Sequence, residues 1–485
     1  MLALITLLGL AIRLIYILGF RYPMVAGGDA FYYHAGANLL AEGRGFIQPM
    51  DYFQQHWTVQ AAEHPPLYIL YLAIPSVLGL KSVLAHQLAT CLLGVATVVL
   101  MGFAGRRIVG PRAGLAAAFL AAAYPNFWAN DALVLSETLA QLTTVIVILI
   151  AYRFWDRRDR AAALWLGVAL GLVILSRAES VLLLVLLVVP LAVGMRSLRR
   201  RGRAGLVLTC WVAALLVVGP WVGYNLTRFE HPVTISTGLD PTLKSASCDA
   251  AWYGPGKGFW ALACIKGHPR VARDLSSLGL VYRQESIDYI KAHLADLPGV
   301  VLAREGRTWG WYRPDQIPNL DNIADGRPKV PARIALWTLW VLEATSLVGA
   351  VVLRRRRVPI SPLIALVVTV TITTAVTFGE TRYRATAEPA LVLLAVAGMD
   401  WLWRQGRQRI RRRPAARAEP VSLLAPGAVT ARGVPVGAAP APSPGSEGAA
   451  APGEQGPEGA AEPEGAAGSQ TPDRERDVVA APDVG

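Results

Sequence analysis

Long apolar segments separated by short polar ones dominate this chain. An α-helix needs about 20 apolar residues to cross a bilayer, and the segments are close to that length. The pattern therefore predicts an all-α polytopic membrane protein with about ten transmembrane helices, at residues 1–20, 82–104, 112–126, 135–153, 161–176, 179–195, 206–223, 333–353, 359–378 and 388–403.

Composition agrees with this class. The chain has 485 residues, of which 53% are hydrophobic and 17% charged, and its mean hydropathy is +0.39. A soluble chain of this size would carry closer to a quarter charged residues. A soluble globular protein is therefore excluded.

The positive charge lies in short arginine clusters between apolar segments. The formal net charge is +13, but the placement is typical of cytoplasmic loops under the positive-inside rule and argues against nucleic acid as a partner. If the N-terminus is cytoplasmic, the predicted spans place every arginine cluster on the cytoplasmic side of the membrane. This predicts a multi-pass plasma-membrane protein with both termini cytoplasmic, the clusters being 106–107, 153–160, 196–203, 354–357 and 404–413.

Residues 66–80 are ambiguous, because counting them as a full span would reverse the predicted membrane orientation of every later helix. We interpret them as an interfacial or re-entrant helix on the outer face. The predicted organisation then has two membrane regions, an outer loop subdomain with an amphipathic helix at 278–297, and a tail that is basic and, from residue 414, disordered. The regions are 1–223 (with outer loops 21–81 and 126–136), 224–332, 333–405 and 406–485.

The four cysteines divide by location. Cys91 and Cys210 lie in predicted spans and are interpreted as packing residues, whereas Cys248 and Cys264 lie in the outer loop. An oxidising compartment would allow that pair to form a disulfide worth roughly 3 kcal/mol for a loop of about fifteen residues. Two free thiols are the alternative.

The first outer loop carries candidate chemistry. Asp29, followed by Tyr33 in an aromatic stretch, has the surroundings of a general base at a membrane mouth. Asp29 as the N-cap of a helix over 30–42 is the alternative. Glu63 and His64 form an ionisable pair before the rigid step Pro65-Pro66, although a plain helix start explains the prolines equally well.

Further charges lie in the other predicted outer loops. Glu137 begins a predicted span, where it is either functional or a helix cap, and Arg177 either acts in the site or pairs only with Glu179. Arg382 and Arg384 are placed to hold a phosphate or diphosphate at headgroup level. Alternatively, the two arginine side chains extend to the phosphates of membrane lipids and have no role in the site.

Five short motifs occur together in order, and this order carries a resemblance. They are Asp29 after the first span, His64-Pro65-Pro66-Leu67, Leu135-Ser136-Glu137, Ser176-Arg177-Ala178-Glu179 and Arg382-Tyr383-Arg384. Over residues 1–405 the chain resembles the GT-C integral-membrane glycosyltransferases of the protein O-mannosyltransferase and aminoarabinose transferase type, often assigned to glycosyltransferase family 39. Cys248 and Cys264 look like a variant among actinobacterial members.

The resemblance implies a cell-envelope hexosyl- or pentosyltransferase that takes its sugar from a polyprenyl-phosphate donor in the membrane lipid. The acceptor, a glycan, lipid or protein, would be extracytoplasmic. Asp29 would be the catalytic base, and Arg382 with Arg384 and Arg177 would bind the donor phosphate. Glu137, Glu63, His64 and Tyr33 would bind acceptor or donor.

Two positions depart from the family's pattern. His64 stands where related enzymes carry a lysine, which puts its phosphate contact in doubt. Gly28 precedes Asp29 where protein O-mannosyltransferases often show paired acids, which makes a protein acceptor less certain.

The expected mechanism is a single inverting displacement in which Asp29 takes the acceptor proton and Arg382 meets the charge of the leaving phosphate. No cofactor and no metal site are predicted, with a divalent cation at Asp29 left open. The competing classes are a transporter or flippase of a lipid-linked sugar, which normally carries its charges at the bilayer midplane, and a structural assembly subunit.

Overall fold

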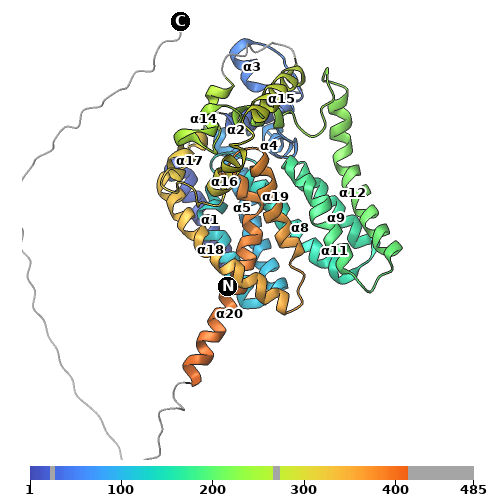
Figure 1. The fold of residues 1–485 in the computed structure, drawn as a ribbon, viewed down its shortest axis with the longest axis vertical. Coiled ribbons are helices and arrows are strands. Elements are labelled where there is room, and N and C mark those ends of the chain that lie inside the picture. The colour runs from blue at the N-terminus through green and yellow to red at the C-terminus, as the bar shows by residue number, and fades with distance from the viewer. Residues whose placement is uncertain (22–27, 266–273, 413–485) are drawn as a thin grey trace, which may run out of the picture. The chain divides into compact units, whose positions relative to one another are not determined.

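The computed structural model describes residues 1–21, 28–265 and 274–412. The chain divides into two compact units, Met1–Ala418 and Glu419–Gly485. The second unit lies outside the described residues, as does the predicted disordered tail from residue 414. The described residues all belong to the first unit (Figure 1).

Helices occupy each of the predicted membrane ranges, and strands are absent from the described parts of the chain. The longer helices run side by side in Figure 1. Their bounds are α1 (Leu2–Tyr16, continued by a π turn to Arg21), α5 (Val83–Ile108), α6 (Pro111–Ala123), α8 (Glu137–Arg157), α9 (Arg160–Ile174), α12 (Arg200–Leu226), α18 (Lys329–Arg355), α19 (Ser361–Val376) and α20 (Glu388–Arg412).

Among these described helices, five are long and apolar enough to cross a membrane: Leu2–Arg21, Val83–Ile108, Glu137–Arg157, Arg200–Leu226 and Lys329–Arg355. Most of the other predicted spans form shorter apolar helices, so the number of about ten stays a prediction. The chain is nevertheless a polytopic helical membrane protein.

The predicted span 179–195 is not one continuous helix. It folds as the 3-10 turn η2 (Ala178–Leu182), α10 (Leu183–Leu186) and α11 (Val188–Gly194). Pro190 explains the break, because proline has no N–H for the helical bond and its ring clashes with the preceding turn.

Helix α4 (Leu67–Val77) corresponds to the ambiguous segment 66–80. Its 11 residues extend about 16 Å at 1.5 Å per residue, about half of a hydrocarbon core. It packs on α2 (Asp29–Ala41). Its length agrees with an interfacial or re-entrant helix.

Small residues let the long helices pack closely. At the contact of α18 with α20, a Cβ on Gly349 would lie 1.8 Å from the carbonyl oxygen of Leu394, and a Cβ on Gly398 would lie 2.2 Å from that of Thr345. Only glycine fits such a backbone approach, which is typical of helix packing in membranes.

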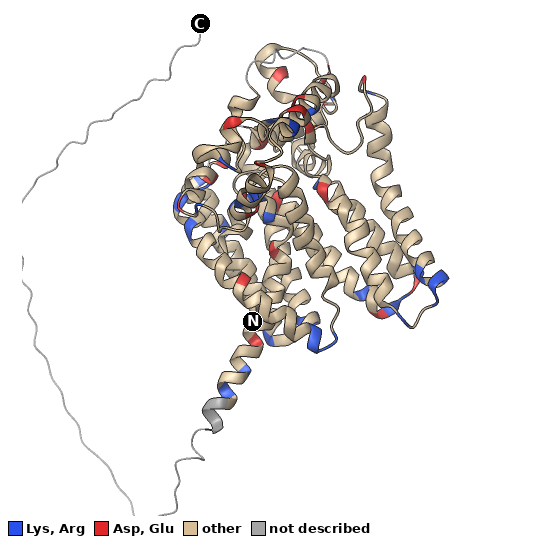
Figure 2. Cartoon of the chain, viewed as in Figure 1, with Lys and Arg blue, Asp and Glu red and all other residues tan. Residues whose placement is uncertain are grey.

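Short helices gather at one end of the bundle (Figure 1), and several of them contribute residues to one cavity. The Lys and Arg of the loops joining α8 to α9, α11 to α12 and α18 to α19 lie at the opposite end (Figure 2). The short helices are α2, α3 (Pro49–Gln55), α4, α13 (Leu239–Ser245), α14 (Asp249–Trp252), α15 (Leu275–Ala292), α16 (Leu297–Thr308) and α17 (Ile317–Asp325).

The predicted outer loop 224–332 belongs to the same compact unit as the bundle. Helix α16 packs on α19 and on the 3-10 turn η5 (Thr381–Thr386). Helix α15 covers most of the predicted amphipathic helix 278–297 but ends at Ala292. Cys248 and Cys264 form a disulfide with their Cα atoms 5.5 Å apart. Cys91 and Cys210 are free and buried.

Candidate active site

A cavity of about 510 Å³ opens among the short helices. Segments from several distant parts of the sequence, between residues 28 and 383, line it. Most of the site residues predicted from the sequence line it, together with two that were not assigned: Asp29, Tyr33, Glu63, His64, Arg177 and Arg382, then Asp325 and Glu380.

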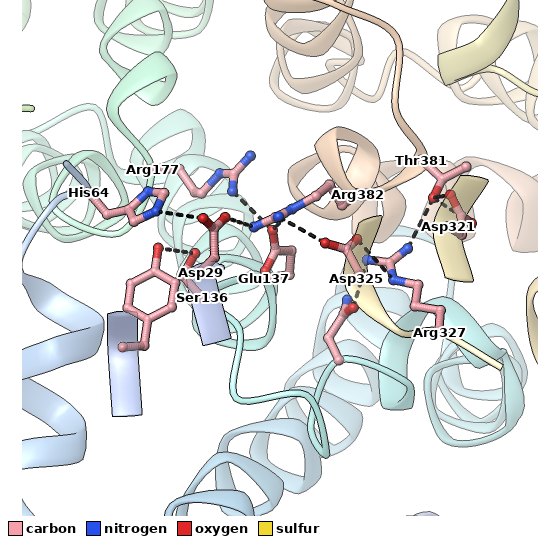
Figure 3. A network of polar contacts seen from close by, with 12 residues as sticks. Asp29, His64, Ser136, Glu137, Arg177, Asp321, Asp325, Arg327, Thr381 and Arg382 are labelled. Atoms are coloured by element: carbon pink, nitrogen blue, oxygen red, sulfur yellow. Dashed lines mark hydrogen bonds and ion pairs between the residues drawn. The ribbon is translucent and has the colours of Figure 1, made fainter. Parts of the chain in front are cut away.

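Arg382, on the turn η5, is the centre of the site (Figure 3). Its Nη2 lies 2.8 Å from Asp29 Oδ2, its Nε 2.7 Å from Glu137 Oε1 and its Nη1 3.0 Å from Asp325 Oδ1. Each guanidinium nitrogen therefore faces a different carboxylate. Such charge-assisted contacts are among the stronger interactions in proteins.

Asp29 is the first residue of α2 and does not act as its N-cap. That position belongs to Gly28, and no side-chain capping bond is made. The carboxylate instead lies between Arg382 and His64, whose Nε2 is 3.2 Å from Asp29 Oδ1. Burial alone would raise the pKa of Asp29, but the charges of His64 and Arg382 hold it well below its ordinary value. Asp29 is therefore ionised.

His64 is fixed by aromatic and ionic contacts. Its ring stacks on Tyr33 with centroids 4.9 Å apart, and the Tyr33 hydroxyl donates to Ser136 Oγ at 3.0 Å. Burial lowers the pKa of His64, but the Asp29 carboxylate outweighs it, so the pKa is raised above its ordinary value. The raised pKa favours the protonated, cationic imidazole beside Asp29.

Glu137 is the first residue of α8 and its side chain is fully buried. Besides Arg382, it accepts a bond from Arg177 Nη1 at 3.1 Å, and Arg177 Nε donates to Glu179 at 2.9 Å. Arg177 therefore does more than pair with Glu179. Glu137 joins two arginines instead of capping its helix.

A second group of polar residues contacts Asp325, the third carboxylate partner of Arg382. This group was not predicted from the sequence. Arg327 Nε lies 3.6 Å from Asp325 Oδ2, and its Nη1 donates to Thr381 at 3.0 Å. Thr381 in turn donates to Asp321 at 2.8 Å. The spacing of Asp321 and Asp325 on one helix face, just before a predicted span, was the available signal.

The other predicted site residues lie less centrally. Glu63 lines the cavity and accepts a bond from Gln48 Nε2 at 2.8 Å. Arg384 does not line the cavity; it is buried and pairs with Glu388 Oε1 at 3.1 Å and with the Thr308 carbonyl. Arg384 as a phosphate ligand stays a prediction.

A buried ion pair next to the site was also missed. Arg13 of α1 lies 2.6 Å from Asp131 Oδ2, with both side chains fully buried, and Thr138 donates to Asp131 Oδ1 at 2.7 Å. A lone arginine inside the first apolar span was the signal. The pair ties α1 to the loop that precedes Glu137.

Comparisons with known proteins agree on the architecture. Residues 63–224, about a third of the chain, match the family model of dolichyl-phosphate-mannose-protein mannosyltransferases. The archaeal oligosaccharyltransferase AglB from Archaeoglobus fulgidus, solved with an inhibitory peptide and a dolichol-phosphate, superposes with a TM-score of 0.50 at 16% identity, over 87% of this chain and 52% of that one. The chain has the GT-C membrane fold.

The same A. fulgidus enzyme tethered to an acceptor peptide gives a TM-score of 0.51 at 14% identity, over 87% of this chain and 51% of that one. The chain thus spans about half the length of these oligosaccharyltransferases. ArnT from Cupriavidus metallidurans, bound to undecaprenyl phosphate, aligns at 16% identity over 86% of this chain and 81% of that one, with a TM-score of 0.35, too low to carry an argument. No curated protein sequence matches the chain.

In this site carboxylates and guanidinium groups alternate. An ionised carboxylate at the cavity surface can accept a proton, and an arginine beside it can hold an anion. Within residues 1–21, 28–265 and 274–412, no group of three or more His, Cys, Asp or Glu is placed to hold a metal ion. The positive charges described in the site are those of arginine and histidine.

Proposed function

We propose that this protein transfers a sugar from a polyprenyl-phosphate-linked donor to an acceptor on the extracytoplasmic face of the plasma membrane. The observation that carries the proposal is the contact between Asp29 and Arg382 in one cavity. A proton acceptor and an anion-binding group lie side by side there, as a displacement at a sugar phosphate requires. The family match over residues 63–224 supports the same chemistry.

The donor phosphate would bind at the cavity side of Arg382. The side chains of Glu137 and Asp325 are 0% and 4% exposed, whereas that of Asp29 is 31% exposed. An incoming phosphate therefore displaces Asp29 most easily. Once Asp29 has lost this contact, its pKa rises toward the ordinary value, so that donor binding makes the carboxylate a better base.

The reaction is a single displacement with inversion. The acceptor hydroxyl oxygen bonds to the anomeric carbon while the bond from that carbon to the phosphate oxygen breaks. The hydroxyl proton goes to Asp29, and the bond's electron pair leaves with the polyprenyl phosphate, whose new charge Arg382 balances. A phosphate is already a good leaving group, so we propose that Arg382 and His64 supply the positive charge without a metal.

The positive-inside rule supports the proposed orientation in the membrane. The basic loops lie at the opposite end of the bundle from the short helices (Figure 2), several of which carry residues that line the cavity. Placing these loops in the cytoplasm puts the cavity outside, where a lipid-linked sugar in the outer leaflet reaches it.

Asp29→Asn tests the proposal, because an amide cannot take the acceptor proton. We expect loss of the envelope glycan, measured by mass analysis of whole-envelope saccharides, with normal expression in the membrane. The matched control is Glu42→Gln, which neutralises an exposed carboxylate at the end of the same helix, where it pairs with Lys81. Unchanged glycan in Asp29→Asn refutes the proposal.

A further inference from the structure

Glu380 is a buried carboxyl group that faces the cavity and lacks a complete set of partners. The residue is 4% exposed and lines the cavity two positions before Arg382. Its Oε1 has no hydrogen-bond partner among the described residues. A buried polar atom left without a partner is costly, so its presence at a cavity wall points to a ligand.

The protonation state of Glu380 decides what it can bind. Burial, reinforced by the nearby Asp325 carboxylate, raises its pKa well above the ordinary value despite Arg382 and Arg327. The raised pKa favours the neutral carboxylic acid, which donates one hydrogen bond and accepts others. A hydroxyl, which also donates and accepts, is a suitable partner; a phosphate belongs at the neighbouring guanidinium.

Aromatic side chains form the wall beside Glu380. Trp260, Phe378 and Tyr383 all line the cavity, with ring centroids of Phe378 6.4 Å from Trp260 and 5.3 Å from Tyr383. Ser176, 1% exposed, adds a buried hydroxyl without a partner among the described residues. Aromatic surface with a few convergent polar groups is typical of small-molecule sites.

The backbone fixes this wall. Trp260 lies in the loop closed by the disulfide, and the Gly379 N–H donates to the Gly258 carbonyl at 2.8 Å. Gly258 has φ +81°, and a Cβ on Gly379 would lie 2.1 Å from the Arg304 carbonyl oxygen. Both positions thus require glycine. This contact between the Gly258 and Gly379 backbones holds Trp260 and Glu380 on the same wall of the cavity.

We propose that Trp260, Phe378 and Glu380 form the subsite for the sugar ring of the donor, an uncharged ring with several hydroxyls. One apolar ring face would cover the aromatic wall, and a hydroxyl would bond to the Glu380 carboxyl. The position next to Arg382 places this ring beside the donor phosphate. The inference rests on the proposed function and adds to it which residues recognise the sugar.

The test compares two kinds of lipid on the full-length protein in nanodiscs: bare undecaprenyl phosphate, and undecaprenyl phosphate carrying mannose, glucose or arabinose. The wild type should bind one glycosylated lipid about tenfold more tightly than the bare lipid, the gain expected from one or two satisfied hydrogen bonds. Glu380→Leu should abolish this preference and leave bare-lipid affinity within twofold. Glu380→Gln, which still donates and accepts, should keep most of it.

Thermal stability separates a binding role from a structural one. Replacing an incompletely bonded buried carboxyl by leucine should leave stability unchanged or raise it. The matched control is Glu305→Leu, a carboxyl outside the cavity lining that bonds to Thr374 and Trp309; it should lose stability and keep the lipid preference. Trp260→Ala should behave as Glu380→Leu, and Trp260→Phe should restore part of the preference.

The outcomes are distinguishable. If the wild type binds neither lipid, the proposed function fails and the inference falls with it. If bare lipid binds but the wild type shows no sugar preference, or Glu380→Leu keeps it, the inference is wrong and the proposed function stands. If Glu380→Leu changes only the KM for an acceptor glycan, the ring at this wall belongs to the acceptor, which also overturns the assignment.

Discussion

Arg382 Nη2 and Asp29 Oδ2 lie 2.8 Å apart, although one residue follows the first apolar span and the other precedes the last helix. The same guanidinium holds the fully buried Glu137. Arg382 is therefore both a structural cation and the anion-binding group of the proposed reaction, and these two roles can be separated by mutation.

Arg382→Ala should be less stable than the wild type by about 3–5 kcal/mol, because it leaves buried carboxylates without their partner. Adding Glu137→Gln removes one of those charges and should recover part of the stability, measured by thermal unfolding in detergent. Binding of undecaprenyl phosphate should stay lost in the double variant. Recovery of binding together with stability would show that the phosphate site lies elsewhere.

Donor binding should weaken at alkaline pH because of His64. The Asp29 carboxylate raises the pKa of His64 against the effect of burial. The contribution of protonated His64 to donor binding is therefore complete below the ordinary pKa of about 6.5, and it is lost as the pH rises through the raised pKa. Asp29 has a lowered pKa and loses its charge only in strong acid.

The matched variant is His64→Lys, whose side chain keeps its charge to about pH 10. Binding of undecaprenyl phosphate to this variant should continue into the alkaline range in which the wild type fails. An identical alkaline limit in both proteins would assign the titration to another group.

The pair of Arg13 and Asp131 should be strongly coupled. Both side chains are fully buried, so Arg13→Met or Asp131→Leu alone should cost about 3–5 kcal/mol, and the double variant Arg13→Met/Asp131→Leu should cost less than the two single changes added together. Thermal unfolding of the three variants measures the coupling. Additive losses would mean that the two residues do not interact.

Gly94→Ala should disturb the same pair, because the added Cβ would lie 2.2 Å from Asp131 Oδ2. Loss of stability is expected, and the conservative control is Gly219→Ala, where a Cβ meets nothing within 4 Å. Equal stability of the two variants would contradict the close contact.

Labelling of the disulfide cysteines tests on which side of the membrane the site lies. In intact cells, a membrane-impermeant maleimide should label Cys248 and Cys264 only after reduction, because their loop is proposed to face outward. The buried Cys91 and Cys210 should stay unlabelled. The control is Cys248→Ser/Cys264→Ser, and labelling confined to inverted vesicles would reverse the proposed topology.

The sequence by itself determined the class of fold and the positions of most helices. Apolar length is enough to predict a membrane helix, because an unpaired backbone in lipid is so costly that each span must form its own hydrogen bonds. The ranges of α5, α8 and α18 follow from this alone. The interruption near Pro190 was not predicted, although a proline within an apolar run was its signal.

The site could be predicted only in part. Asp29, His64, Arg177 and Arg382 are charges in predicted outer loops, and such charges are costly enough near a membrane to mark function. Which of them meet was decided by the tertiary structure: Asp325 and Glu380 enter the cavity, whereas Arg384 turns to Glu388. Contacts between segments that are far apart in the sequence depend on how the helices pack. The spacing of residues within one segment does not determine that packing.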